Sequence, residues 1–460
     1  MSRQISWHND KVARNTNIIS EGDKDNDPDG QGDPPHPAPQ TTPAFGGYFP
    51  GSREYRRISV ALFLAGLATF ALLYNTQPLL PTISKVFSIT AGESALSVSA
   101  ATLGLGVALL VFGPASEVLG RTKLMYFSLF TASVVGILTG LAPTWELLLV
   151  SRVLLGVTLA GLPAVAMSYL TEEIAATHLP RAAGLYIGGT ALGGMSGRLV
   201  TGLVADFLDW RAALVVVGVI SLACAIAVLL LLPKSRNFVR EDASLKLLAR
   251  QVVGAWTDPV LVGLYAVAAL GMGAFVGMFN AIGFRLEGPP YNLSVGLAGL
   301  VFLVYPVGSV ASTVAGRMAS RFGQRRVSPV GALIFLIGIT VTLVDSLPGM
   351  IVGLALMMAG FFAVHGVAAG WVSVRAAAGH RSKGHASSTY MAAYYAGSSA
   401  FGPLTGVAWQ HGGWDWVIIL CAILAGATLA LVVALGLTRS LLWPGGAPGL
   451  LDWGKPKNTN

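Results

Sequence analysis

Two arginines interrupt apolar stretches of the sequence, and their chemistry needs an explanation first. Arg198 lies in the glycine-rich segment "GGTALGGMSGRLV" (188–200), and Arg152 lies about five residues inside another apolar stretch. A guanidinium in apolar surroundings is costly and usually faces a cavity or a partner. We therefore expect Arg198 either to form a buried ion pair or to anchor a substrate, and the candidate acids are Asp206 and Glu146. The alternative for both arginines is a side chain that extends to the nearest water.

Proton chemistry has few candidate groups inside the apolar stretches. No Asp or Glu lies deep in any of them, whereas His365 does. Histidine titrates near neutral pH, so His365 is the substitute for a buried carboxylate. A packed, hydrogen-bonded histidine without a proton role is the alternative.

The elements that must position these residues are long apolar helices. Charged residues make up 11% of the chain, against about 25% in soluble domains. Runs of about 20 apolar residues match a hydrocarbon core of about 30 Å, and helices satisfy their own backbone there. The sequence predicts an all-α membrane protein with twelve transmembrane helices, near 58–80, 95–115, 124–142, 147–169, 182–205, 212–232, 259–284, 295–315, 328–346, 349–372, 385–408 and 415–437.

The distribution of basic residues predicts the orientation. The near-membrane segments on one side hold 19 Lys and Arg, and the opposite loops hold three, Lys85, Arg211 and Arg285. By the positive-inside rule both termini are cytoplasmic. No basic patch remains that would indicate nucleic acid. The lone cysteines Cys224 and Cys421 indicate packing residues, so we expect no metal site and no cofactor.

Internal repeats divide the chain into two halves. "GPASEVLGRTK" (113–123) matches "GRMASRFGQRR" (316–326) at an offset of 203 residues, and "YIGGTALGGMSG" (186–197) matches "YAGSSAFGPLTG" (395–406) at an offset of 209. Parallel repeats of this kind place a binding site between two pseudo-symmetric six-helix bundles. The predicted parts are a disordered cytoplasmic tail (1–52), a first bundle (53–232), a cytoplasmic linker (233–257), a second bundle (258–438) and a C-terminal tail (439–460).

These motifs resemble those of the major facilitator superfamily. "GPASEVLGRTK" resembles its signature between helices 2 and 3, with Glu117 where Asp is usual. "SRVLLG" (151–156) resembles the helix 4 signature, whose arginine is Arg152, and "GGTALGGMSG" (188–197) resembles the helix 5 signature of the antiporter branch. Other stretches, such as "FNAIGFRL", resemble a bacterial inner-membrane member.

The resemblance implies a role for each motif. The signature between helices 2 and 3 implies a cytoplasmic gate, closed by ion pairs in one state and packed through small residues; the alternative is a short basic loop. The predicted gate residues are Gly113, Glu117, Gly120, Arg121, Lys123, Gly316, Gly323 and Arg325. The helix 5 and helix 11 motifs imply close contacts across the interface between the bundles, or static packing. The predicted interface residues are Gly189, Gly193, Gly197, Gly402, Pro403 and Gly406.

The resemblance also implies that the first helix of each half lines a central cavity. Gln77 and Asn280 are separated by the same offset of 203 residues as the gate motifs. We predict a cavity-lining amide pair, with Tyr74, Asn75 and Tyr394 as further polar groups. Hydrogen bonding between helices is the alternative. For Arg152 the resemblance favours a role in coupling.

The predicted function is alternating-access transport of a small organic molecule, exported in exchange for protons. Uptake of a sugar or organic anion is the first alternative, and a non-transporting sensor or scaffold is the second. An enzyme is not expected, because the sequence has no HExxH motif and no nucleotide-binding loop. The expected partners are a substrate, protons and the lipid bilayer, and we expect a monomer in the bacterial inner membrane.

Overall fold

The computed structural model describes residues 46–238, 254, 256–379 and 381–438. Most of both predicted tails and the middle of the predicted linker therefore lie outside the described residues. The described part is almost entirely helical. Its helices are α1 (Arg53–Tyr74), η1 (Gln77–Leu79), α2 (Leu80–Phe87), α3 (Ala91–Leu119), α4 (Arg121–Gly140), α5 (Trp145–Leu159), α6 (Ala166–Glu173), α7 (Leu179–Phe207), α8 (Trp210–Leu231), α10 (Pro259–Glu287), α11 (Val295–Gly299), η2 (Leu300–Val304), α12 (Tyr305–Phe322), α13 (Gln324–Val341), α14 (Leu347–Ala378) and α15 (Lys383–Leu437).

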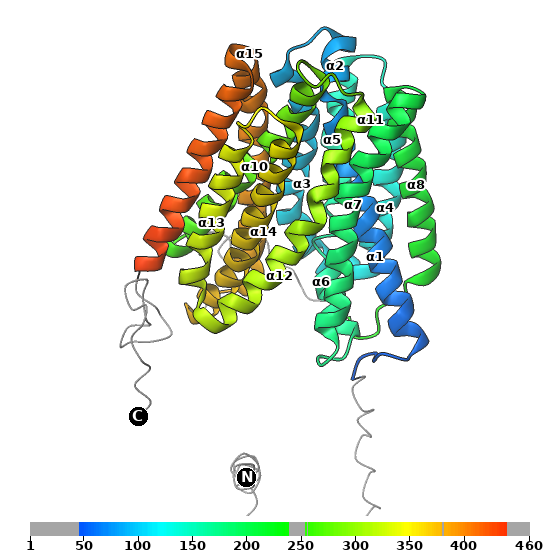
Figure 1. The fold of residues 1–460 in the computed structure, drawn as a ribbon. Coiled ribbons are helices and arrows are strands. Elements are labelled where there is room, and N and C mark those ends of the chain that lie inside the picture. Colours follow the sequence, from blue (N-terminus) through cyan, green and yellow to red (C-terminus); the bar gives the residue numbers. More distant parts are fainter. Residues whose placement is uncertain (1–45, 239–253, 255, 380, 439–460) are drawn as a thin grey trace, which may run out of the picture. The chain divides into compact units, whose positions relative to one another are not determined.

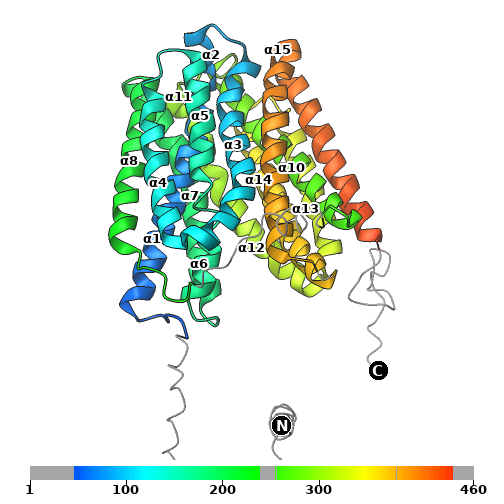
Figure 2. The ribbon, with the colours of Figure 1, turned by 180° about the vertical axis from the view of Figure 1, so that it is seen from behind.

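These helices form the twelve predicted spans. Nine helical segments of the described chain are long and apolar enough to cross a membrane. One of them, α15, contains two helices joined at a kink, where Gly412 and Gly413 leave helical geometry. The pair α5–α6 and the long helix α7 supply the remaining two. Helices α1–α8 form the first bundle and α10–α15 form the second (Figures 1 and 2).

Several spans are broken where the sequence predicted continuous helices. The first span ends its helix at Tyr74 and continues through η1, which has Pro78 in its first turn. The fourth span stops at Leu159 and resumes at Ala166, with Pro163 in the gap. Proline removes a backbone donor and disfavours helix for the residue before it. The breaks free backbone carbonyls that other side chains must satisfy.

The glycines of α7 pack this helix against α1 inside the first bundle. A Cβ at Gly189 would lie 2.3 Å from the Phe63 carbonyl oxygen, and one at Gly193 would lie 2.2 Å from that of Leu67. Gly197 meets Ala71 in the same way. The expectation that these three glycines lie between the bundles is therefore wrong. The spacing of four residues on both helices indicates close packing of one helix face on another.

The matching motif of α15 does lie between the bundles. A Cβ at Gly406 would stand 2.5 Å from the backbone nitrogen of Gly92 on α3, and one at Gly92 would stand 3.3 Å from the carbonyl oxygen of Pro403. Gly402 lies beside the side chains of Ser99 and Asn280. The repeated sequence motif thus serves two different contacts, one within a bundle and one between bundles.

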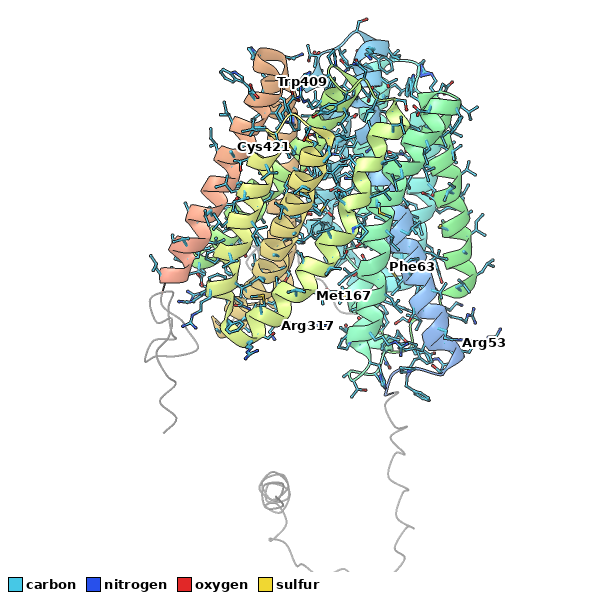
Figure 3. The ribbon with its side chains drawn as sticks, in the orientation of Figure 1. Arg53, Phe63, Met167, Arg317, Trp409 and Cys421 are labelled. Carbon is cyan, nitrogen blue, oxygen red and sulfur yellow. The ribbon has the colours of Figure 1, made fainter. Side chains whose placement is uncertain are left out.

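The two gate motifs keep the same backbone at their second glycine. Gly120 has φ 92° and ψ 139°, and Gly323 has φ 90° and ψ 147°. Each residue ends one helix and precedes the next. Such positive φ values favour glycine, which explains why both halves have it at this position. Arg53 and Arg317 lie toward the end of the molecule that carries these loops, and Trp409 lies toward the opposite end (Figure 3).

Candidate functional site

A chain of hydrogen bonds joins the two bundles at the level of η1. The Gln77 side-chain nitrogen Nε2 donates to Asn280 Oδ1 at 2.7 Å, and the Arg198 nitrogen Nε donates to Gln77 Oε1 at 2.6 Å. All three side chains are buried. In this conformation the side-chain amides of Gln77 and Asn280 are hydrogen-bonded directly to each other across the two bundles. Their predicted place in the wall of a central cavity stays a prediction. We call these three residues the polar lock.

Aromatic rings from both bundles surround the Arg198 guanidinium. Its Cζ atom lies 4.3 Å from the ring centre of Tyr74, 4.9 Å from that of Tyr305 and 5.0 Å from that of Phe302. A guanidinium over a ring face gains about 0.5–2 kcal/mol, more when it is desolvated. Within its own helix, Nη1 donates to the Gly194 carbonyl at 2.5 Å. The rings of η2 and α12 were not predicted, because only the fold shows which faces of these helices point to α7.

The predicted ion pair of Arg198 is not present. Within the described part of the chain, Arg198 is in none of the ion pairs found. Asp206 instead accepts a hydrogen bond of 2.6 Å from Ser294 of the second bundle. Glu146 is exposed. The buried charge is met by rings, an amide and a carbonyl rather than by a carboxylate.

Two donors of the polar lock have no acceptor among the described residues, and one of them, Asn280 Nδ2, is fully buried. The hydrogen bonds of Arg198 use Nε and Nη1, so Nη2 has no partner among the described residues. Asn280 Nδ2 is buried and also lacks a partner there. Buried donors without acceptors are rare and costly. A ligand with acceptor oxygens would satisfy both.

Arg152 donates hydrogen bonds to the end of α1, where the first span is broken. Its guanidinium donates to the carbonyl oxygens of Leu72 at 3.1 Å, Leu73 at 2.6 Å and Ser97 at 2.8 Å, and to Asn75 Oδ1 at 3.1 Å. Leu72 and Leu73 lie in the last turn of α1, where carbonyls lack helical partners and a positive charge is favourable. The side chain is fully buried and does not extend to water. Its role in coupling stays a prediction.

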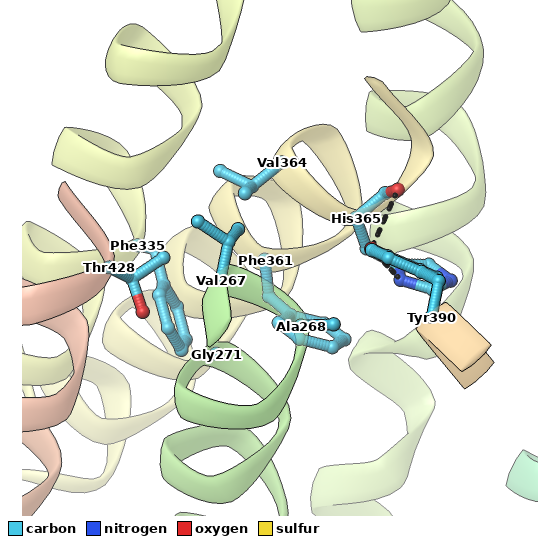
Figure 4. A pocket seen from close by; sticks show the side chains of 9 residues that line it. All are labelled: Val267, Ala268, Gly271, Phe335, Phe361, Val364, His365, Tyr390 and Thr428. Carbon is cyan, nitrogen blue, oxygen red and sulfur yellow. Dashed lines mark hydrogen bonds between the residues drawn. The ribbon is translucent and has the colours of Figure 1, made fainter. Parts of the chain in front are cut away.

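His365 belongs to an aromatic cluster of the second bundle. Its Nδ1 atom lies 3.0 Å from the Tyr390 hydroxyl oxygen (Figure 4), and its ring centre lies 4.7 Å from that of Tyr394. A cavity of about 10 Å³ beside it is lined by Phe361 and Thr428, among others. This is about the room that one water needs. A histidine that has a hydroxyl partner and space for water is suited to exchange a proton, which stays a prediction.

The first glycine of each gate motif does not pack closely against a neighbouring helix. Nothing lies within 4 Å of a Cβ placed on Gly113 or Gly316, so the close approach predicted there is absent in this conformation. Arg121 pairs with Glu172 of α6 at 3.0 Å and donates to Ser116. Among the ion pairs found in the described ranges, none includes Glu117. Lys123 is exposed, and Arg325 donates to the Thr438 carbonyl. The pairs that would close this end stay predictions.

A second cluster of charges was missed at the same end of the second bundle. Asp258 caps the N-terminus of α10 and accepts from the guanidinium groups of Arg375 at 2.9 Å and Arg381 at 3.3 Å. Burial alone would raise the pKa of Asp258. The hydrogen bonds from Arg375 and from the backbone of Val260 outweigh burial and hold this pKa below its ordinary value. An Asp before a Pro at a predicted helix start was the available signal.

Relatives of this chain are membrane transporters. The sequence is 41% identical to the inner membrane transport protein YnfM of Escherichia coli, over 85% of this chain and 93% of that protein. It is 39% identical to the MFS-type transporter YybF of Bacillus subtilis, over 86% of this chain and 96% of that protein. The first likeness confirms the resemblance to a bacterial inner-membrane member. These relatives are transporters and not enzymes.

Solved structures of membrane transporters share the fold of this chain. The nucleoside transporter NupG superposes with a TM-score of 0.66 at 12% identity, over 82% of this chain and 98% of that chain. An inward-facing bacterial homologue of the lysosomal transporter Spinster has a TM-score of 0.62 at 16% identity, over 85% of this chain and 95% of that chain. The chain itself matches the Major Facilitator Superfamily over residues 62–288 and 288–443. Two six-helix bundles, repeated gate motifs and these matches together show that the chain belongs to the major facilitator superfamily.

Proposed function

We propose that this protein is a secondary active transporter that moves a small organic molecule by alternating access. The observation that carries the proposal is the polar lock, because its members come from both bundles and hold only noncovalent contacts. Gln77 and Arg198 belong to the first bundle, and Asn280 belongs to the second. Rocking of the bundles would break these contacts at one end while the gate motifs close the other.

Export in exchange for protons is the proposed direction. The helix 5 motif supports it, since this motif resembles the antiporter branch of the superfamily. His365 supports proton coupling, because it is hydrogen-bonded to Tyr390 beside a cavity large enough for water. The proposed location is the bacterial inner membrane with both termini in the cytoplasm, which rests on the asymmetry of basic residues.

Transport of an organic anion is a second candidate, favoured by the arginines. Arg198 and Arg152 are buried without a carboxylate partner among the described residues. An anion that reached the polar lock would meet Arg198 Nη2 and Asn280 Nδ2, which both lack acceptors in the part of the chain that the structure describes. Charge-assisted hydrogen bonds of this type are roughly twice as strong as neutral ones.

Flux through purified protein tests both candidates. Proteoliposomes with an imposed pH gradient would be loaded with small organic anions, cations or neutral compounds, and a pH-sensitive dye would report proton movement. Export against the proton flux supports the proposal. Gln77→Leu should lower this flux, whereas Gln410→Leu, at an exposed glutamine of α15, should not. Flux that ignores the pH gradient would contradict proton coupling, and no flux of any compound would contradict transport.

A further inference from the structure

A long apolar groove opens on the side of the second bundle between α12 and α13. Its volume is about 720 Å³, and α14 contributes to its lining. The walls include Val310, Val314 and Val330, which are 65%, 46% and 49% exposed. On a soluble protein such a patch would mark an interaction site. In a membrane-spanning chain an exposed apolar groove of this kind is suited to lipid.

Small side chains make the groove hollow. Gly331 of α13 and Ala359 and Ala363 of α14 contribute to its lining. A Cβ at Gly331 would lie 3.1 Å from Val364 Cγ2 and 3.2 Å from Ala363 Cβ, so these two helices pack closely there. The space that remains lies on the side of α12. The close packing of α13 on α14 therefore forms one side of the groove and leaves its interior open.

The dimensions of the groove suit a single acyl chain. Its lining on α12 extends from Pro306 to Phe322, or about 24 Å at 1.5 Å per residue. This is less than the hydrocarbon thickness of about 30 Å. The groove therefore stays within the apolar layer and reaches one of its surfaces, at the end that carries the second gate motif.

That end of the groove is strongly basic. Arg326 lines the groove, and Arg317 and Arg321 are exposed on the same short segment, 316–326, which contains no acid. Arg317 and Arg321 form no ion pair within the described ranges. The first gate motif differs, because Glu117 belongs to it and its arginine pairs with Glu172. Basic pockets between helices at a membrane surface bind anionic lipid headgroups.

We propose that the groove binds one acyl chain of an anionic phospholipid whose phosphate contacts the arginines of the second gate motif. The apolar walls recognise the chain, and the cluster of arginines selects a negative headgroup. The lipid would link α12 to α13, the two helices that this gate loop connects. The site is independent of the substrate and of the direction of transport.

Lipid retention and thermal stability test this proposal. The full chain would be purified in detergent and titrated with phosphatidylglycerol or phosphatidylcholine, with bound lipid counted by native mass spectrometry. Phosphatidylglycerol should be retained and should raise the melting temperature more than phosphatidylcholine does. Arg326→Gln should lower the apparent affinity for phosphatidylglycerol about fivefold, which corresponds to about 1 kcal/mol for one basic residue at an anionic surface. Arg53→Gln, an equal charge change on the first bundle, should leave it unchanged.

Filling the groove gives a second test. Ala311 lines the groove, so Ala311→Phe should displace the acyl chain and lower retention of phosphatidylglycerol. Ala223→Phe, at an exposed alanine of α8, is the matched control and should retain the lipid. Equal retention of both lipids, or an equal effect of Arg53→Gln and Arg326→Gln, would overturn the proposal. Unchanged retention in Ala311→Phe would also overturn it, and if that variant does not fold, the charge variants decide.

Discussion

Gln77 and Asn280 are 203 residues apart in the sequence, and their side-chain amides lie 2.7 Å apart in space. The same separation relates the two gate motifs, so the internal repeat brings equivalent positions of the two halves face to face. Each side-chain amide has both a donor and an acceptor, so two amides at equivalent positions can form a hydrogen bond with each other without any charge. The contact holds the bundles together at the level of the polar lock.

This contact predicts non-additive mutations. Gln77→Leu and Asn280→Leu should each lower the stability of the detergent-solubilised protein, because each leaves a buried polar partner. The double variant should lose less than the sum, with a coupling of about 1 kcal/mol. Thermal unfolding of the four proteins measures this cycle. Strictly additive losses would show that the amides do not interact.

The aromatic surroundings of Arg198 predict a small stability change and a large activity change. Arg198→Met leaves no carboxylate stranded, so its cost should stay at about 1–2 kcal/mol, below the roughly 3–5 kcal/mol of a broken buried ion pair. Flux should fall strongly. Arg211→Met removes an arginine that stacks on Trp210 at 4.2 Å, and it should keep its flux. A stability loss in the larger range would indicate a carboxylate partner.

Two glycines of α7 predict opposite effects of the same substitution. Gly193→Ala places a Cβ 2.2 Å from the Leu67 carbonyl oxygen, so α1 and α7 must separate and stability should fall by about 1–3 kcal/mol. Gly188→Ala meets nothing within 4 Å, and it should stabilise by about 0.5–1 kcal/mol. Melting temperatures of both variants provide the comparison. A tolerated Gly193→Ala would contradict the packing of α7 on α1.

The charge cluster around Asp258 predicts a pH dependence. Because its pKa in the folded protein lies below the ordinary value of about 3.9, Asp258 stabilises the fold above that pH, and this stabilisation is lost as pH falls through the folded pKa. Asp258→Asn should lower stability at pH 7 by roughly 2–3 kcal/mol and should flatten the stability profile at acid pH. Asp345→Asn removes an exposed pair with Arg285 and should cost less than about 1 kcal/mol. Identical profiles for wild type and Asp258→Asn would refute this role.

The helices and their repeat could be predicted, because both depend on local patterns. Apolar runs of membrane length predicted twelve spans, and the offset of 203 residues predicted that Gln77 and Asn280 are equivalent. The break after Leu159 was missed although Pro163 signals it. Hydropathy counts the apolar residues of a segment and does not register a missing backbone donor.

Partners across the fold could not be predicted from local patterns. Arg198 was expected to meet an acid, since charge complementarity is visible in a sequence, whereas ring faces depend on how α7 and α12 are rotated. The glycines of α7 were assigned to the wrong interface for the same reason. Glycine spacing shows that a helix has a close neighbour and does not show which helix that neighbour is.

The cap that Arg152 places on the end of α1 makes three helices of the first bundle one mechanical unit. The Arg152 guanidinium of α5 donates hydrogen bonds to two carbonyls of α1 and one of α3. Gln77 lies five residues beyond Leu72, so these bonds restrict its independent movement. Separation of Gln77 from Asn280 would then require this whole block to tilt, and local unwinding would not suffice. The hydrogen bonds of this one side chain would in this way determine how rigidly the first bundle moves when the two bundles rock.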